Sequence, residues 1–276
     1  MRKTNISAAI FSGIGDRSQQ EDGFLVGKDV FLSDIEKEKM ANDRSFVLLR
    51  KQNVSFPFMC AVSDGMGGQA AGEKASAIVI SELNKRYERM LEERRDAAAI
   101  AEELVNINDE LCRISMEKLA WRGMGATLSA VIADETQVLI IHVGDSRVYL
   151  KTEKDLEQIT KDHTEGRRLM DMGLLTEEEE KRFPYRKRLY KYMGREGRLT
   201  VDLKCCSMRK GQHLLICSDG ISDILTDQEI SASFEQIEDQ KKAGTLTIVD
   251  FLAKKVKEKD EDLDNMTAVA LSWTDK

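Results

Sequence analysis

The sequence predicts an α+β protein in which antiparallel β-sheets are covered by helices. Two observations support this class: strand-like runs come in clusters, and long helical patterns come in pairs between those clusters. A one-by-one alternation of strand and helix would instead indicate a parallel sheet, and the chain does not follow that pattern. Its 276 residues are enough for a sizeable hydrophobic core.

The first strands are indicated by three apolar runs, which read ISAAIFSG, SFVLLRK and FPFMCAVSD at residues 6–13, 45–51 and 56–64. Apolar residues then recur at helical spacing over residues 69–92, which predicts one long amphipathic helix beginning just after Gly68. A second helical pattern over residues 96–120 gives that helix a partner.

The second half of the chain begins with three strand patterns in quick order, at residues 126–134, 136–145 and 147–152. Their close spacing predicts hairpins in an antiparallel sheet. Residues 163–198 are dense in charge and poor in strand pattern, so we expect a partly helical surface excursion there. The remaining patterns predict strands at 199–206 and 213–220, a helix at 247–259 and a final strand at 266–273.

Charge and cysteine content limit the class of protein. The net charge of −7 argues against generic nucleic-acid or membrane-surface binding, which favours a basic face, and suits a protein that holds cations. No CxxC spacing occurs, and one apolar run near the N-terminus is shorter than the roughly 7–15 residues of a signal sequence. We therefore expect a cytoplasmic protein without a zinc site, whose five thiols are reduced: Cys60, Cys112, Cys205, Cys206 and Cys217.

The three histidines do not suggest a catalytic dyad. Of His142, His163 and His213, the first and last lie in alternating apolar runs, which favours packed strand histidines. If the protein performs chemistry, carboxylates must carry most of it.

Acidic residues stand at the ends of predicted strands. FMCAVSDGMGG and HLLICSDGISD are both apolar runs that end in Ser-Asp-Gly, and they place Asp64 and Asp219 at strand ends. The other candidates are Asp145 in a tight Gly-Asp-Ser turn, Asp264 just before the last strand, and the pair Glu21 and Asp22 after the first.

Carboxylates brought together in this way would suit a hard divalent cation such as Mg²⁺ or Mn²⁺, which takes oxygen ligands. Gly65 after Asp64 would let its own carbonyl approach a metal, or would let the turn take a positive φ. Asp-Gly is also a common turn pair, and Asp a common helix cap, so each aspartate alone has a purely structural interpretation. Five acidic strand ends in one chain are harder to explain in that way.

Seven elements of the chain match one known family in the same order. They are RSQQED (17–22), VSDGMGG (62–68), GMGATLSAVI (123–132), HVGDSRVYL (142–150), ITKDHT (159–164), LLICSDGISD (214–223) and DNMT (264–267). With them the chain resembles the metal-dependent protein serine/threonine phosphatases of the PP2C type (PPM family), in their bacterial form. The resemblance covers nearly the whole chain. It implies a sandwich of two antiparallel β-sheets flanked by pairs of helices, as one domain over residues 1–276. Within it, residues 163–198 would form a flap beside the active site.

The resemblance also implies roles for individual residues. Asp64 would bridge two metals, with the Gly65 carbonyl on one of them, and Asp219 and Asp264 would complete the other. Asp145 would share a third metal site with Asp219. The full set of implied metal ligands is Glu21, Asp22, Asp64, Gly65, Asp145, Asp219 and Asp264. Arg17 would grip the substrate phosphate, so that the implied catalytic residues are Arg17, Asp64 and Asp219.

The implied reaction is hydrolysis of phosphoserine and phosphothreonine in proteins, with Mn²⁺ or Mg²⁺ as cofactor. Two cations would lower the pKa of a bridging water, and the resulting hydroxide would attack phosphorus in line, without a phosphoenzyme. The implied partners are phosphorylated proteins and a cognate serine/threonine kinase, and we expect a monomer.

The chain departs from the family pattern at a few positions. Gln20 replaces an Asn, from which we expect little effect, and Ala126 replaces a Thr, which we expect to change the packing. Met66 stands where some eukaryotic members have a general-acid His, so the general acid is left open, with a metal-bound water as our hypothesis. Lys187 and Arg188 add charge to a basic stretch of the flap, either as a solvated surface or to attract acidic phosphopeptides.

Two alternatives differ from a general phosphatase. A catalytically silent relative would bind phosphoproteins or signal by conformation, but such proteins usually lack metal ligands, and here the principal acidic positions are intact. A specialised regulatory phosphatase would share the chemistry and act on one partner protein.

Overall fold

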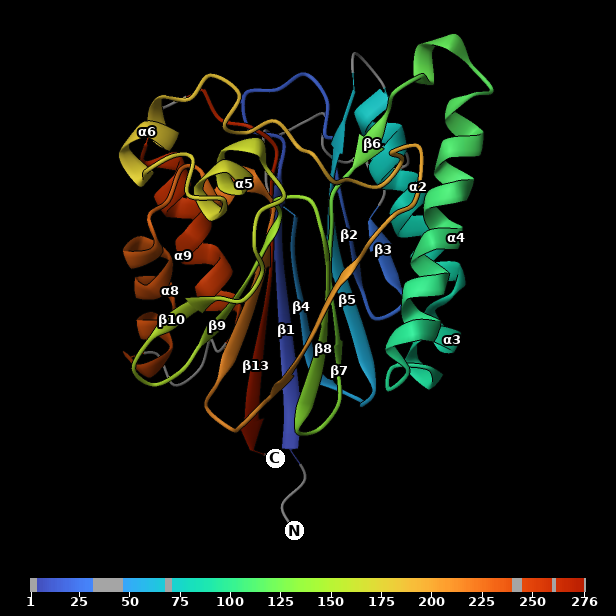
Figure 1. Cartoon of the computed structure of the whole chain (residues 1–276). Helices are drawn as coiled ribbons and strands as arrows, with labels where there is room; N and C mark the ends of the chain where they lie inside the picture. The colour runs from blue at the N-terminus through green and yellow to red at the C-terminus, as the bar shows by residue number, and fades with distance from the viewer. Residues whose placement is uncertain (1–3, 32–46, 68–70, 240–244, 260–261, 276) are drawn as a thin grey trace.

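Two β-sheets pack face to face between two layers of helices (Figure 1). The computed structural model describes residues 4–31, 47–67, 71–239, 245–259 and 262–275. All the strand pairs recorded in these ranges are antiparallel. The predicted α+β sandwich of antiparallel sheets is therefore confirmed.

The first sheet has six strands in the order β10-β9-β12-β13-β1-β4. Their bounds are β1 Thr4–Gly13, β4 Val47–Val54, β9 Arg147–Lys151, β10 Leu156–Gln158, β12 His213–Cys217 and β13 Met266–Asp275. The second sheet has the order β11-β8-β7-β5-β2-β3, with β6 paired to β5 beside this path. Its strands are β2 Asp22–Val26, β3 Asp29–Phe31, β5 Phe58–Met66, β6 Gly125–Ala126, β7 Leu128–Ala133, β8 Gln137–Val143 and β11 Asp202–Ser207.

Helices cover the outer face of each sheet. The second sheet is covered by α2 (Ala71–Lys85), α3 (Tyr87–Glu92) and α4 (Ala97–Ser115), on the right in Figure 1. The first sheet is covered by α8 (Asp227–Asp239) and α9 (Thr245–Lys257), on the left. The short elements η1 (Leu119–Trp121), α5 (Glu165–Asp171), α6 (Glu177–Arg182) and α7 (Asp219–Ser222) belong to connections.

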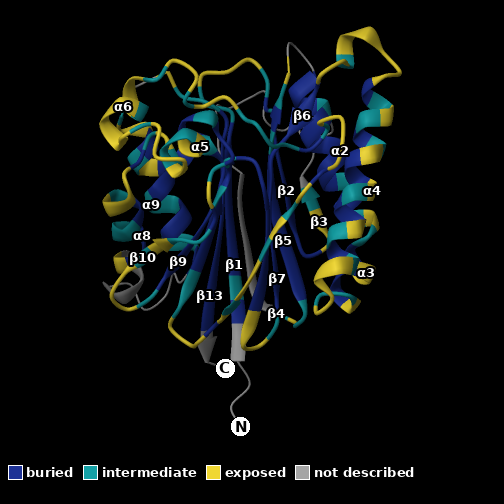
Figure 2. Ribbon diagram, in the orientation of Figure 1, coloured by how far each residue is buried: buried dark blue, intermediate teal, exposed yellow. Residues whose placement is uncertain are grey.

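The core has three layers because alternate residues of a buried strand face opposite sides. In β5, Cys60 and Val62 join the cluster between the two sheets, whereas Met59 and Ala61 join the cluster under α2 and α4. A third cluster lies between the first sheet and the helices α8 and α9. Figure 2 shows these buried layers in dark blue, with exposure confined largely to helix surfaces and connections.

The structure corrects one predicted helix and supplies an unpredicted one. The helix expected over residues 69–92 is divided into α2 and α3 by a turn at Arg86, and its start lies outside the described residues. The Arg86 guanidinium contacts Glu82 on α2 and, at 3.1 Å, Glu103 on α4, so this junction is tied to the neighbouring helix. Helix α8 was not expected from the sequence pattern.

A second correction concerns the strands β7, β8 and β9, for which close spacing predicts successive hairpins. β7 and β8 do pair, but β9 belongs to the other sheet and pairs with β12 and β10. The tight turn at residues 144–146 therefore carries the chain from one sheet to the other. This crossing places Asp145 at the end of the sandwich, between the two sheets.

In the described part of the chain, we find no helix with the length and apolar character needed to cross a bilayer. All five cysteine thiols are free.

Candidate active site

The ends of the elements that carry the acidic residues singled out in the sequence lie at the end of the sandwich opposite the start of β1 and the end of β13 (Figure 1). Asp64 lies at the end of β5 and is the strand partner of Asp22 on β2. Asp219 begins α7 directly after β12, Asp145 lies in the crossing between β8 and β9, and Asp264 precedes β13. Both sheets thus contribute carboxylates to one region.

The backbone of Asp64 is fixed by Thr127. The Asp64 N–H donates to Thr127 Oγ1 at 2.9 Å, and the Thr127 N–H donates to the Asp64 carbonyl at 2.8 Å. Thr127 Oγ1 also lies 2.6 Å from Ser146 Oγ, in the turn that carries Asp145. A buried chain of hydroxyl groups therefore ties two of the acidic segments together.

Both Asp-Gly pairs need glycine for the same steric reason. A Cβ on Gly65 would lie 2.0 Å from the carbonyl oxygen of Gly72, and a Cβ on Gly220 would lie 2.0 Å from the carbonyl oxygen of Asn265. Neither glycine is among those with positive φ, so the turn interpretation of Gly65 does not hold. What the position requires is a close approach between two backbone segments.

A cradle forms where Glu21 meets the start of α2. A Cβ on Gly72 would lie 2.8 Å from Glu21 Oε2 and 2.7 Å from the Gly65 carbonyl oxygen, so these two oxygens face the same small space. Asn265 fixes the loop that carries Glu21: its side-chain oxygen accepts from the Glu21 N–H at 2.7 Å, and its amide donates to two loop carbonyls at 2.9 Å.

Asp22 is fully buried, and only one of its two carboxylate oxygens has a hydrogen-bond partner. Its Oδ2 accepts a hydrogen bond of 2.7 Å from Ser218, the residue before Asp219, while its Oδ1 has no partner. A buried carboxylate oxygen without a partner is costly, which makes it a position where a cation or an ordered water would be stabilised.

The electrostatics indicate uncompensated negative charge. Burial, with repulsion from Asp264, raises the pKa of Glu21 to about 7. Burial and neighbouring aspartates raise the pKa of Asp22 to about 7 and that of Asp219 to about 6. The pKa values of Asp64 and Asp145 are held well above the usual range by burial and by Asp219. Burial and repulsion among the carboxylates raise these pKa values, and the nearby cations Arg17, Arg147 and Lys187 offset that only in part.

Oxygen-only donors, an orphaned carboxylate oxygen and mutual repulsion together fit a hard divalent cation. The side chains are not arranged as a complete coordination site: within the described ranges, no group of three or more His, Cys, Asp or Glu side chains is placed to hold a metal ion. Asp264 is instead engaged by Arg17, whose guanidinium lies 2.7 Å from its Oδ2, with both side chains about half exposed.

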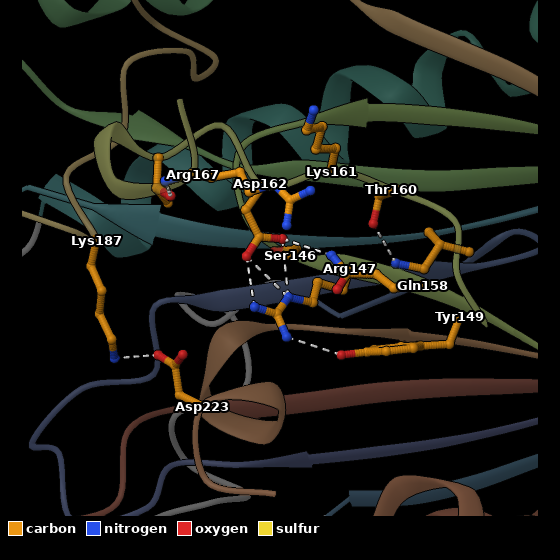
Figure 3. Close-up of polar contacts among 12 residues, drawn as sticks. Ser146, Arg147, Tyr149, Gln158, Thr160, Lys161, Asp162, Arg167, Lys187 and Asp223 are labelled. Carbon is orange, nitrogen blue, oxygen red and sulfur yellow. Dashed lines mark hydrogen bonds and ion pairs between the residues drawn. The ribbon is translucent and has the colours of Figure 1, made fainter. Parts of the chain in front are cut away.

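Two cavities open beside these residues. One of about 570 Å³ is lined by Asp64, Asp145 and Asp219 and by the flap residues Lys187 and Tyr192. A neighbouring one of about 470 Å³ shares Asp145, Asp219 and Lys187 and extends under α5. In Figure 3, Lys187 reaches from the flap side to form an ion pair with Asp223, one helical turn after Asp219. The flap residues therefore border the acidic site.

The histidines lie as expected. His142 is buried in β8, between Ser129 Oγ at 2.9 Å and the Lys161 carbonyl at 3.0 Å, and burial lowers its pKa to about 3. His213 in β12 contacts Ser272 Oγ at 2.6 Å, and burial lowers its pKa to about 4.

Sequence reasoning missed the residues that hold the carboxylates in place. Thr127, Ser218 and Asn265 each stand inside a quoted motif, but their partners lie far away along the chain. Ser218 and Asn265 are adjacent to an acidic motif residue, which is a signal that could have identified them, whereas the motif around Thr127 has no acidic member.

Comparison with known proteins gives a consistent result. The family Protein phosphatase 2C matches residues 33–259. The serine/threonine phosphatase stp of Listeria welshimeri is 31% identical over 172 residues, which span 61% of this chain and 68% of that protein. PstP of Mycobacterium tuberculosis, a serine/threonine protein phosphatase, is 36% identical over 174 residues, 62% of this chain and 33% of its own length.

Solved structures agree over the whole fold. The serine/threonine phosphatase Stp1 from Staphylococcus aureus superposes with a TM-score of 0.75 at 27% identity, over 99% of this chain and 95% of the other. The catalytic domain of PstP, solved with two manganese ions, gives a TM-score of 0.71 at 25% identity, over 99% and 100% of the two chains. The expected family is thereby confirmed: the chain belongs to the protein phosphatase 2C family.

Proposed function

We propose that this protein hydrolyses the phosphate esters of phosphoserine and phosphothreonine in proteins, using divalent cations held by the acidic site. The observation that carries the proposal is the gathering of buried, mutually repelling carboxylates from both sheets around one cavity. The names of the relatives, all serine/threonine phosphatases, support the same activity over a catalytically silent protein.

The chain supplies a ligand set suited to Mn²⁺ or Mg²⁺. We assign Asp64, Asp219 and Asp264, with the Gly65 carbonyl, to two metals, and Asp145 with Asp219 to a third. Glu21 and Asp22 would ligate or hold metal-bound waters. The Glu21 carboxylate and the Gly65 carbonyl already face one space, and Asp22 Oδ1 is buried without a partner, which supports this part of the assignment.

When bound, such cations lower the pKa of a water molecule and offset charge on the phosphoryl group. The chain's own contribution is to bind and orient the phosphate. Arg17 presents a planar guanidinium that suits phosphate oxygens. It forms an ion pair with Asp264 at the site, and a bound phosphate would compete with Asp264 for it. Met66 borders the cavity and has no proton to give, so the leaving oxygen must be protonated by another group.

The finer organisation is also a proposal. We infer a single domain over residues 1–276, in which residues 163–198 act as a flap that affects substrate choice. Free thiols are compatible with a reducing compartment, so we place the protein in the cytoplasm. We also propose that it is a monomer. Its partners would be phosphorylated proteins and a cognate kinase.

The test is hydrolysis of a phosphothreonine peptide with Mn²⁺ and with a chelator, by the wild type and by Asp219→Asn. We expect activity only with metal and a loss of at least about a hundredfold in kcat in the variant, because a ligand in the reacting site is lost. Asp227→Asn, an exposed position at the start of α8, is the matched control and should retain full activity.

Folding of Asp219→Asn is checked by thermal unfolding, which should be unimpaired because no core volume is removed. Wild-type turnover in Asp219→Asn, or hydrolysis that ignores the chelator, would overturn the assignment. An inactive wild type over a range of metals and pH would favour the silent alternative.

A further inference from the structure

The stretch ITKDHT at residues 159–164 has no part in the reaction proposed above, yet it lies along the turn that carries Asp145. The Ile159 N–H donates to the Val148 carbonyl at 2.8 Å, and Thr160 Oγ1 accepts from the Val148 N–H at 2.9 Å. Asp162 binds the Arg147 guanidinium, with Nη2 to Oδ2 at 2.6 Å and Nε to both oxygens at 3.0 and 3.1 Å (Figure 3). These contacts hold the side of the turn that follows Asp145.

His163 holds the side of the turn that precedes Asp145. Its backbone N–H donates to the Gly144 carbonyl at 2.8 Å, and the Gly144 N–H donates to His163 Nδ1 at 2.9 Å. A backbone N–H can only donate, so Nδ1 must accept. The imidazole is therefore neutral, with its proton on Nε2.

The remaining nitrogen of the ring connects to the flap. His163 Nε2 lies 3.0 Å from Asp202 Oδ2, and Asp202 Oδ1 accepts from Lys191 Nζ at 2.6 Å. The Tyr190 N–H also donates to the His163 carbonyl at 3.0 Å. Two flap residues, Tyr190 and Lys191, are thus joined to the Asp145 turn through His163 and Asp202.

The surroundings leave this ring little freedom. His163 is only 3% exposed and stacks on His142, with ring centroids 4.7 Å apart. Gly144 has φ +110°, and a Cβ there would lie 2.7 Å from Thr127 Cβ, so the turn is also packed against the residue that fixes Asp64. A shift of Gly144 would therefore be felt at both acidic segments.

We propose that His163 is a positioning residue: through Gly144 it fixes the turn that carries Asp145, and through Asp202 it links that turn to the flap. The inference rests on the proposed function, because it takes Asp145 as a metal ligand. It adds that the geometry of the metal position assigned to Asp145 and Asp219 depends on His163 Nδ1, the nitrogen that accepts from Gly144.

Two substitutions separate the two nitrogens. His163→Asn keeps an acceptor near the place of Nδ1 and loses the reach to Asp202, whereas His163→Gln keeps a donor near the place of Nε2 and loses the acceptor for Gly144. His213→Gln is the matched control, since His213 is also a hydrogen-bonded histidine, but it lies in β12 at the end away from Asp219.

The measurement is Mn²⁺ binding to metal-stripped protein by calorimetry, together with the unfolding temperature and the Mn²⁺ concentration for half-maximal hydrolysis. Asp145→Asn should abolish one Mn²⁺ binding event. We expect His163→Gln to weaken the same binding roughly tenfold, because the buried Gly144 N–H is left without an acceptor. His163→Asn should stay within about threefold of the wild type, and His213→Gln should lower only the unfolding temperature.

The positioning role is overturned if both His163 variants bind Mn²⁺ like the wild type, or if both lose binding equally. Should His163→Gln fail to fold, Asp202→Ala takes its place, because Asp202 is about half exposed and its removal leaves His163 Nε2 without this acceptor. It should weaken the same binding by about threefold, and unchanged binding would refute the proposal. If Asp145→Asn binds as many Mn²⁺ ions as the wild type, Asp145 is not a ligand and this inference falls, while Mn²⁺-dependent hydrolysis by the wild type would still uphold the proposed function.

Discussion

Gly65 and Gly220 illustrate how single residues set the geometry of this site. Each follows an aspartate, and each allows a carbonyl oxygen of another segment to approach within a distance that no side chain would tolerate. The contact at Gly65 joins the end of β5 to the first turn of α2, and the contact at Gly220 joins α7 to the residue before β13. The aspartates are thereby held by backbone packing as well as by hydrogen bonds.

Replacing Gly65 with alanine should therefore cost far more stability than an ordinary glycine substitution. We expect Gly65→Ala to lower the free energy of unfolding by about 3 kcal/mol or more, or to give no folded protein, because backbone atoms must move apart. Gly173→Ala is the control: its φ is +70°, but nothing lies within 4 Å of an added Cβ. It should cost about 1 kcal/mol. Urea unfolding of both variants measures the difference, and equal losses would contradict the steric explanation.

At this scale, the sequence predicted the acidic residues and not their supports. An aspartate at a strand end can be recognised locally, from the apolar run before it and the glycine after it. Ser218 bonds Asp22 across 196 positions of the chain, and Asn265 bonds the Glu21 backbone across 244, so neither contact has a local pattern. The pair of Arg17 with Asp264 was missed for the same reason.

Among the elements, the crossing from β8 to β9 shows the limit of spacing arguments. A short polar turn between two strand patterns looks the same whether the strands pair with each other or enter different sheets. The outcome here depends on long-range pairing, since β9 finds β12 as its neighbour. The long helices, by contrast, were predictable because their apolar periodicity directly reflects the buried face.

The flap gives a prediction at the same scale. Lys187 lines both cavities and forms an ion pair with Asp223. An acidic residue of a substrate peptide, next to the phosphorylated residue, would compete with Asp223 for the Lys187 ammonium group. We expect Lys187→Ala to lower kcat/KM for a phosphopeptide with acidic flanks by roughly threefold more than for one with neutral flanks.

Added salt should reduce that difference, because the Lys187 side chain is about half exposed and its charge is screened. Lys181→Ala on α6 is the control, since Lys181 pairs with Glu177 on the same helix and lines neither cavity. Equal effects of both substitutions on the two peptides would argue against flap recognition of acidic flanks.

For the whole molecule, the acidic site is a cost to folding that cations can offset. The pKa of Asp219 is raised from 3.8 to about 6 by burial and by Asp223, so the folded protein holds a proton there that the unfolded chain releases. The stability of the metal-free protein should therefore fall, through this group, as pH rises from about 4 to about 6. The amide introduced by Asp219→Asn does not titrate, so without metal the stability of this variant relative to the wild type should rise over this window.

Mn²⁺ should reverse this trend because it binds the deprotonated carboxylates. We expect the rise in unfolding temperature caused by Mn²⁺, relative to chelator, to grow between pH 5.5 and 7.5, roughly the range in which Asp219, Glu21 and Asp22 lose protons. The buried histidines titrate alike in both solutions and cancel. A Mn²⁺ effect that does not change with pH would contradict a carboxylate site.

The pairing of β1 with β13 has a mechanical consequence. The two strands are antiparallel neighbours in register from Thr4 opposite Asp275 to Gly13 opposite Met266, with both chain ends on one side (Figure 1). A force that pulls the two ends apart would therefore load the hydrogen bonds of this ladder one after another, as in a zipper, rather than all together in shear. Rupture would begin at the Thr4 and Asp275 end of the ladder, and the strand pairs beside the acidic site would be the last to separate.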